Sequence, residues 1–319
     1  MSQVFRKVFP LLPLVAAMSV LCFFAGCSKS SQPPVQPVHP TPGPPIVAAL
    51  PDSLSNGVDL QPSYYNNGNP NFAWDTLKAQ VKIKTVRIEI EPDKVAQAVT
   101  WIAQARAHGL QVIATYHKYT VLGTDSASEL LAAANWWKAH YKTLGADFTI
   151  NLMNEWGSHS ITPAKYASAY NAAIAVVRTV YSGYIILDLP GYGQETYTVY
   201  QASKTSSPAL IDTNIIFSAH VYPNGYNQGR NHTLQASDLS DITKSGRKGI
   251  IGEFGNGATG TADWSGIVDA AKAAGWPVIG WCWNGDGGNM NMVDPSWAVN
   301  STATSFSKSA YFPVVYNKL

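Results

Sequence analysis

Two glutamates, each close behind an apolar run, are the first candidates for chemistry. Glu155 follows such a run in the stretch NLMNEWG, next to Asn154, and Glu253 does so in GIIGEFG. Two carboxyl groups held close together can divide acid–base and nucleophilic work, because one can donate a proton while the other stays ionised. That chemistry requires both side chains to reach one place, which depends on the elements that carry them.

These elements alternate between short apolar runs and amphipathic stretches. Eight runs are typical of buried strands, at residues 57–60, 85–90, 111–116, 147–153, 184–189, 214–221, 248–253 and 277–283. Between them, residues 93–108, 128–144, 163–180 and 263–275 have the pattern of helices. Eight βα repeats in about 265 residues predict an α/β fold, a single (β/α)8 TIM barrel. An open doubly wound sheet is the alternative, but no glycine-rich phosphate-binding fingerprint follows an early strand.

In such a barrel the active site lies at the C-terminal ends of the strands, so polar residues there are candidates by position. The set comprises Arg87, His117, Asn154, Glu155, His220, Tyr222, Glu253 and Trp283. The two glutamates would lie on opposite sides of the barrel mouth, close enough to flank a sugar. Retaining glycoside hydrolases place two carboxyl groups ~5 Å apart, and an amide such as that of Asn154 can bind the sugar 2-hydroxyl. The arrangement therefore favours glycoside hydrolysis.

Each candidate also has a simpler explanation. A glutamate near a strand end often caps the next helix or pairs with an arginine, so only the joint order and spacing of the set favour catalysis. His117 and His220 could be zinc ligands, but no HxH or HxxxH pair supports this, and we expect neither a metal nor a cofactor. Trp156, on a loop after Glu155, is a candidate for contact with a sugar ring.

Four stretches, in their order along the chain, resemble glycoside hydrolase family 5 of clan A. They are NLMNEWG, SAHVYP, GIIGEFGNG and GWCWNGDG, and the likeness covers nearly the whole chain after residue 51. The resemblance implies that Glu155 is the acid/base and Glu253 the nucleophile. It further implies supporting roles for Arg87 and Tyr222 at the nucleophile, for Asn154, His117 and His220 at the central subsite, and for Trp283 as a platform under the sugar. Many members have Asp where Thr115 stands, which leaves the partner of His117 open.

The residues of two of these stretches imply a substrate through their resemblance to known enzymes. INLMNEWGSH and GWCWNGDGGNMNMV are most similar to the endo-β-1,4-mannanases of the family, whereas its cellulases more often have Asn-Glu-Pro at the fourth strand. The resemblance implies a retaining endo-acting enzyme on mannan or glucomannan, with cellulose as the alternative. A non-catalytic glycan-binding lipoprotein is a further hypothesis, although such a protein would be expected to lose one of the two glutamates. We expect a monomer.

The first residues have the pattern of a secretory signal. Arg6 and Lys7 precede an apolar stretch that ends in FAGC, which resembles the bacterial lipoprotein box and predicts a lipid on Cys27. Residues 28–51 are dense in proline and predict an extended linker, which leaves residues 52–319 as the hydrolase domain. We therefore expect export and a lipid anchor in a bacterial membrane, at the outer membrane or cell surface, with plain secretion as the alternative.

The charge and the cysteine content argue against nucleic acid as a partner and against a disulfide in the mature chain. Removal of the signal takes Arg6 and Lys7 with it and lowers the formal net charge from +2 to 0, so nucleic acid is not an expected partner. Apart from the lipidated Cys27, the mature chain would keep only Cys282, and no intramolecular disulfide could form. A domain of this size can bury enough apolar surface to be stable without one.

Overall fold

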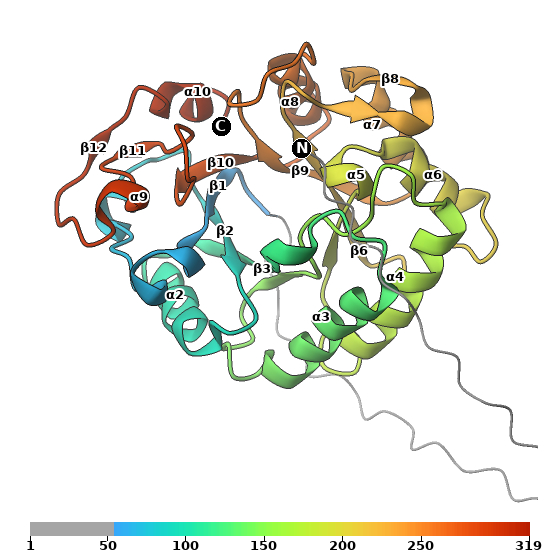
Figure 1. Cartoon of the computed structure of the whole chain (residues 1–319), viewed down its shortest axis with the longest axis horizontal. Helices are drawn as coiled ribbons and strands as arrows, with labels where there is room; N and C mark the ends of the chain where they lie inside the picture. Colours follow the sequence, from blue (N-terminus) through green and yellow to red (C-terminus); the bar gives the residue numbers. More distant parts are fainter. Residues whose placement is uncertain (1–53) are drawn as a thin grey trace, which may run out of the picture. The chain divides into compact units, whose positions relative to one another are not determined.

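The computed structural model describes residues 54–319, so the predicted signal, Cys27 and the proline-rich linker lie outside the described residues. Its main feature is a parallel barrel (Figure 1). In spatial order the strands are β10 (Ile279–Asn284), β1 (Gly57–Leu60), β2 (Thr85–Ile90), β3 (Gln111–Tyr116), β4 (Thr149–Asn151), β5 (Ile185–Asp188), β6 (Ile215–Val221) and β9 (Lys248–Phe254). Ile251 of β9 forms a parallel bridge with Val278, just before β10, and this closes the ring. The predicted (β/α)8 fold is confirmed.

Helices surround the barrel. They are α1 (Trp74–Lys78), α2 (Val95–Ala107), α3 (Ala127–His140), α4 (Pro163–Val177), α5 (Pro190–Gly193), α6 (Thr196–Lys204), α7 (Leu239–Lys244), α8 (Trp264–Ala273), α9 (Trp297–Asn300) and α10 (Phe312–Tyr316). Two short hairpins are added, β7 (Tyr226–Asn227) with β8 (His232–Thr233) and β11 (Val293–Asp294) with β12 (Ser307–Lys308). The start of α4 shows how local sequence sets a boundary, because the Thr162 hydroxyl accepts a hydrogen bond from the Lys165 amide and Pro163 suits the first turn.

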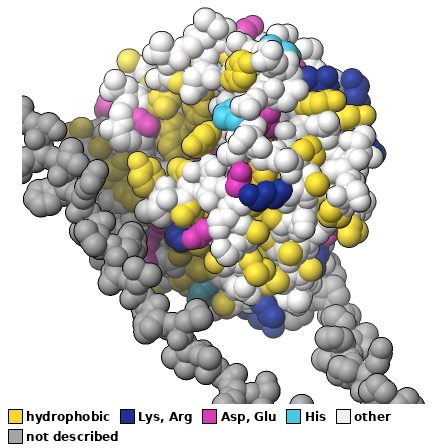
Figure 2. Space-filling view, turned by 45° about the vertical axis from the view of Figure 1, so that its right-hand side comes forward, with side chains coloured by type: hydrophobic (Ala, Val, Ile, Leu, Met, Phe, Trp, Pro, Cys, Tyr) yellow, Lys and Arg dark blue, Asp and Glu magenta, His cyan; other side chains and the backbone are white. Residues whose placement is uncertain are grey.

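The surface of the barrel carries mixed charges. On the face in Figure 2, acidic and basic side chains are interspersed among polar and small apolar groups. This distribution agrees with the low net charge of the sequence. Among residues 54–319, no helix combines the length and the apolar composition that crossing a bilayer requires.

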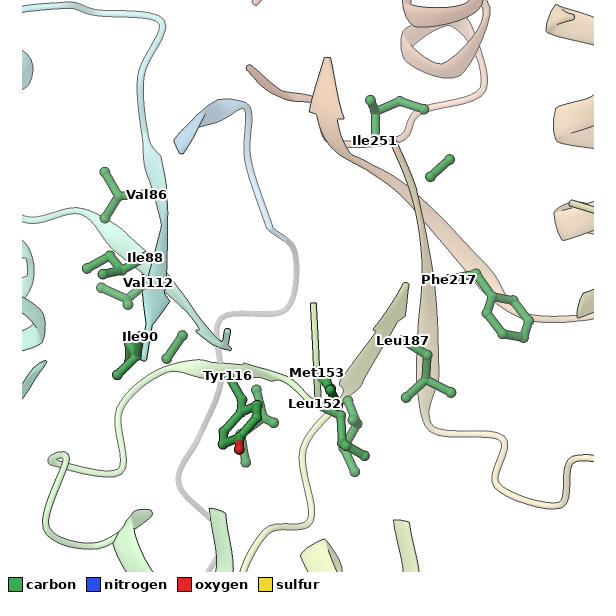
Figure 3. Close-up of a cluster of buried hydrophobic side chains, with 14 of the residues drawn as sticks. Val86, Ile88, Ile90, Val112, Tyr116, Leu152, Met153, Leu187, Phe217 and Ile251 are labelled. Atoms are coloured by element: carbon green, nitrogen blue, oxygen red, sulfur yellow. The ribbon is translucent and has the colours of Figure 1, made fainter. Parts of the chain in front are cut away.

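Apolar side chains fill the space between strands and helices. Figure 3 shows part of this cluster, with Val86, Ile88 and Ile90 from β2 and with Leu187 and Phe217 from β5 and β6. Successive side chains of a strand point to opposite faces, so the residues between these positions face the inside of the barrel. Burying each large aliphatic or aromatic group contributes roughly 1.5–3 kcal/mol, which makes this outer layer the main source of stability.

The inside of the barrel has an apolar base and a polar upper layer. Five isoleucines, Ile113, Ile186, Ile216, Ile250 and Ile279, form a separate buried cluster. Along β5 the next inward position after Ile186 is Asp188, and along β6 Ser218 and His220 follow Ile216. The pairing of β6 with β9 shifts register after Ala219, so that His220 pairs with Glu253. The strands therefore deliver acidic and basic side chains together at their C-terminal ends.

Candidate active site

Glu155 lies just beyond β4 in an unusual backbone conformation. Its φ is +49°, in the left-handed region that non-glycine residues rarely adopt. Its backbone amide donates a 3.0 Å hydrogen bond to Oδ2 of Asp188, at the end of β5. The side chain is 15% exposed, so the carboxyl group faces the mouth while Asp188 holds the turn beneath it.

Glu253, near the end of β9, is held on both carboxylate oxygens. Oε1 accepts a hydrogen bond from Arg87 Nη1 at 3.0 Å, and Oε2 accepts one from the Tyr222 hydroxyl at 2.8 Å. Burial and the adjacent Glu253 carboxylate raise the pKa of Tyr222 well above its ordinary value, so the phenol remains a donor. The structure thus places both predicted neighbours beside Glu253 and fixes the direction of its carboxylate.

His220 lies between the two glutamates. Its Nδ1 is 3.0 Å from Glu155 Oε1 and 3.4 Å from Glu253 Oε1, while Nε2 is 3.6 Å from Asp188 Oδ2. Burial alone would lower the pKa of this imidazole, but Glu253 and Asp188 raise it well above its ordinary value. Ligand atoms of Glu155, His220 and Glu253 all lie within 4.8 Å of one another. A carboxylate pair at this separation fits double displacement, in which the two groups stand ~5 Å apart.

Arg87, on β2, is the centre of a wider buried network. Nη1 lies 2.8 Å from Asp59 Oδ1 and 3.0 Å from Glu89 Oε1, in addition to its contact with Glu253. Nη2 donates to Asn154 Oδ1 at 2.5 Å and lies 3.5 Å from Asp188. Three carboxylates that could otherwise collect a cation, Asp59, Glu89 and Glu253, therefore already share the positive charge of the guanidinium.

Three acids of this network, Asp59, Glu89 and Asp188, were not predicted from the sequence. Burial raises the pKa of Asp59 and of Glu89, and the repulsion of Glu253 adds to it. Burial also acts on Asp188, but His220 and Arg87 outweigh it and lower its pKa to about 2. A signal was available, because each acid interrupts an apolar strand, in GVDL, TVRIEI and IILD. An acid inside such a run is costly unless it is paired.

His117, just after β3, has partners that the sequence left open. Nδ1 lies 2.9 Å from Glu91 Oε1 and 3.0 Å from the Tyr64 hydroxyl, and Nε2 lies 3.5 Å from Glu89. Burial would lower the pKa of His117, but Glu89 and Glu91 raise it. Glu91 thus supplies the carboxylate partner of His117 that Thr115 cannot supply, and it orients the imidazole.

Comparison with known proteins identifies the family of this chain. The family model described as Cellulase (glycosyl hydrolase family 5) matches residues 63–287. The chain belongs to glycosyl hydrolase family 5. The resemblance read from the four motifs is therefore confirmed.

Two similar curated relatives are both named mannan endo-1,4-beta-mannosidase. The protein from Streptomyces lividans is 27% identical over 203 residues, which is 60% of this chain and 51% of that protein. The one from Cellvibrio japonicus is 25% identical over 211 residues, 62% of this chain and 47% of that protein. The chain thus spans about half the length of each.

Solved family 5 structures share the fold at low sequence identity. The catalytic domain of a mannanase from Streptomyces sp. SirexAA-E has a TM-score of 0.66 at 22% identity, with 83% of this chain and 85% of that chain covered. The endoglucanase Cel5A of Thermobifida fusca has a TM-score of 0.62 at 17% identity, with 83% and 91% covered. Both mannanases and cellulases of the family therefore have this barrel.

Two aromatic residues predicted to contact sugar do not reach the mouth of this family 5 barrel. Trp156 is fully buried, packs against Tyr166 and Tyr170 of α4, and donates its indole hydrogen to the Ser126 carbonyl. Trp283 is 1% exposed and donates to the Phe72 carbonyl at 3.2 Å. Neither can offer a free face to a sugar ring, and both predictions are wrong.

Trp281 is the partly exposed indole of β10. In the pairing of β1 with β10, Val58 lies opposite Gly280 but Leu60 lies opposite Asn284, so β10 has two extra residues at this point. Such a bulge breaks the alternation of side chains. The sequence W-C-W could not show which of its two tryptophans stays partly exposed.

We predict that the buried imidazoles make the fold less stable at alkaline pH. The pKa values of His117 and His220 are raised above the unfolded value of about 6.5, so their stabilisation is full below that pH and is lost as pH rises through the folded pKa values. Tm should fall by roughly 3–10 °C between pH 6.5 and 9. Differential scanning calorimetry would measure this in the wild type and in His117→Gln, which should show a smaller fall.

The matched control for this prediction is His140→Gln. His140 lies at the end of α3 and packs against Trp136 outside the barrel mouth, so this variant should keep the wild-type slope. A Tm that stays constant from pH 6.5 to 9 would contradict the raised pKa values of the two imidazoles.

Proposed function

We propose that the protein is a retaining, endo-acting glycoside hydrolase that cleaves β-1,4-linked mannan. The observation that carries the proposal is the pair Glu155 and Glu253, whose carboxylate oxygens lie within 4.8 Å around His220. A non-catalytic glycan-binding protein would have no need of such a pair. Mannan is favoured by the motifs and by the names of the two curated relatives.

The two glutamates act in sequence. Glu253, aimed by Arg87 and Tyr222, attacks the anomeric carbon, and the bond to the leaving oxygen breaks as Glu155 gives that oxygen a proton. Water then attacks the same carbon while Glu155 takes its proton, and the ester bond to Glu253 breaks. Two inversions retain the anomeric configuration.

Three other residues bind the sugar or stabilise charge during these steps. Asn154, whose Oδ1 is held by Arg87, has its amide nitrogen available for the sugar 2-hydroxyl. Trp281, in place of Trp283, supplies the aromatic face in this proposal. His220 stabilises negative charge as it moves from Glu253 to Glu155, because its Nδ1 lies within 3.4 Å of both.

Cellulase activity is the second candidate. The matching family model is described as a cellulase, and the solved cellulase of Thermobifida fusca in complex with cellotetraose has a TM-score of 0.63. A mannanase from Thermomonospora fusca in complex with mannohexaose has the same TM-score. Mannose and glucose differ only at the 2-hydroxyl, so the barrel itself does not separate the two.

Release of reducing ends by the purified chain separates the candidates. We expect release from pure mannan and glucomannan and little from carboxymethylcellulose. Proton NMR of the first products should show the β anomer before mutarotation. Release from cellulose alone would move the proposal to a cellulase, while an initial α anomer would rule out double displacement.

We further propose that the chain is exported and anchored by a lipid on Cys27, with residues 28–51 as a spacer. The support is the FAGC box, which ends an apolar segment preceded by the basic residues Arg6 and Lys7. In a bacterial host, radiolabelled palmitate should label the wild type and leave Cys27→Ser unlabelled. Equal labelling of both forms would contradict the anchor, and an unlabelled wild type in the culture medium would indicate plain secretion.

A further inference from the structure

An exposed tyrosine next to Glu155 has a backbone that core packing does not explain. Three successive residues of α5, Gly191, Tyr192 and Gly193, have φ values of +63°, +57° and +81°. For the tyrosine this conformation costs about 1–2 kcal/mol. The residue is 44% exposed, so its side chain is not part of the core. Such backbone outliers cluster at ligand-binding and catalytic positions.

The segment that carries Tyr192 packs against two neighbours of Glu155, the Gly157 backbone and the His220 side chain. It follows β5 and lies beside β6 and α6 (Figure 1). The Gly191 amide donates to the Gly157 carbonyl at 2.8 Å, and a Cβ at Gly193 would lie 2.5 Å from the side chain of His220. A Cβ at Gly191 would likewise lie 2.5 Å from His159 Nδ1, so both glycines are needed for α5 to approach the site.

The tyrosine hydroxyl reaches the loop on the other side of Glu155. A Cβ at Gly123 would lie 2.7 Å from the Tyr192 hydroxyl, so this oxygen is in contact with Gly123. The Gly123 amide in turn donates to the Glu155 carbonyl at 2.8 Å. The ring of Tyr192 thus lies across the loop that carries Glu155.

A histidine beside this ring is oriented by a buried acid. The ring centres of His159 and Tyr192 are 6.0 Å apart. Nδ1 of His159 lies 2.6 Å from Oε1 of Glu195, which is 1% exposed and also accepts from the Gln228 and Gly229 amides. A carboxylate can only accept, so the hydrogen is on Nδ1. Nε2 has no partner among residues 54–319, and the imidazole is 29% exposed.

We infer that Tyr192 and His159 bind the sugar unit on the leaving-group side of the scissile bond. The ring of Tyr192 would cover an apolar face of that sugar, and His159 Nε2 would bind one of its hydroxyls. The side follows from the proposed function, on which this inference rests: Glu155 must reach the glycosidic oxygen, so the departing sugar lies next to Glu155.

The same place then receives a sugar acceptor in the second step. An acceptor hydroxyl bonds to the anomeric carbon, the bond to Glu253 breaks, and the hydroxyl proton passes to Glu155. Tyr192 and His159 therefore set the ratio of sugar transfer to hydrolysis. Water needs neither residue, and this difference makes the inference testable.

The test uses the full chain trapped as its glycosyl-enzyme with 2-deoxy-2-fluoro-β-mannobiosyl fluoride, with the gluco-configured reagent in parallel. Recovery of activity is followed in buffer alone and with added mannobiose or cellobiose. In the wild type the disaccharide should accelerate recovery. In Tyr192→Ala and His159→Ala, the acceleration should fall about tenfold when it is expressed relative to recovery of the same variant in buffer. Tyr192→Phe should retain most of it, because the ring remains.

Tyr226→Ala is the matched control. Tyr226 is 39% exposed on β7, and its hydroxyl is engaged by Asn231, so this variant should behave as the wild type. Formation of the adduct, seen by mass spectrometry, reports that each variant is folded. An adduct on which Tyr192→Ala and His159→Ala keep full acceleration would overturn the inference alone. A wild type that forms no adduct with either reagent would overturn the proposed function and the inference with it.

Discussion

In the Glu253→Ala variant, hydrolysis of mannan should fall by at least about 10⁴-fold, because the group that forms the covalent intermediate is absent. Arg87 and Tyr222 would remain around the vacated space and would attract a small anion. Azide should therefore restore turnover of an activated aryl β-mannobioside by attacking the anomeric carbon directly. A single displacement inverts the centre, so the product should be the α-glycosyl azide, which proton NMR identifies.

The matched control for this prediction is Asp147→Ala. Asp147 lies two residues before β4, at the end of the barrel opposite the site, and pairs with Arg106 at 2.5 Å, so its loss should leave turnover unchanged. Activity of Glu253→Ala within tenfold of the wild type would contradict its role as nucleophile. So would a β-glycosyl azide as the rescued product.

Glu155→Ala should show a loss that depends on the leaving group. Mannan, whose leaving oxygen needs a proton, should be cleaved about 10²–10⁴-fold more slowly. A 2,4-dinitrophenyl β-mannobioside should form the intermediate at nearly the normal rate, because dinitrophenolate departs without a proton. Stopped-flow absorbance would then show a burst followed by slow turnover. Azide needs no general base, so it should remove the slow phase and yield the β-glycosyl azide.

Two outcomes would argue against this role of Glu155. One is an equal loss of activity on mannan and on the dinitrophenyl substrate, which is the pattern of a misfolded site. The other is rescue by azide with the α product, because that would exchange the roles of the two glutamates. Asp188 holds the backbone of residue 155 through its amide, so the Ala variant should keep the loop in place.

The barrel and the carboxylate pair could be predicted because both leave local signals. Strands β2, β3 and β6 appear as apolar runs within one residue of their observed bounds, since their outward positions are apolar throughout. Glu155 and Glu253 stand where such runs stop. Strand β4 was predicted too long at both ends: it spans Thr149–Asn151, and the apolar Leu152 and Met153 that follow it are buried in the core.

The buried network could not be predicted in the same way. Asp59, Glu89 and Asp188 come from three strands, and their common partner Arg87 is evident only once the barrel is closed. The errors at Trp156 and Trp283 have a similar cause. Whether a loop indole reaches solvent depends on the helix beneath it, here Tyr166 and Tyr170 of α4, and in β10 on a bulge that the alternation rule does not foresee.

The apolar base of the barrel limits the access of salt ions to the buried charges. The five isoleucines cover the layer of charges from below, so ions can approach Arg87, His220 and their acids only through the mouth, which a bound polysaccharide covers. Mobile salt screens buried charge pairs much less than exposed ones. The charges of Arg87 and His220 are therefore balanced by carboxylates of the protein itself, and the neutral substrate adds no charge. Added salt should therefore have little effect on the charge balance of the active site.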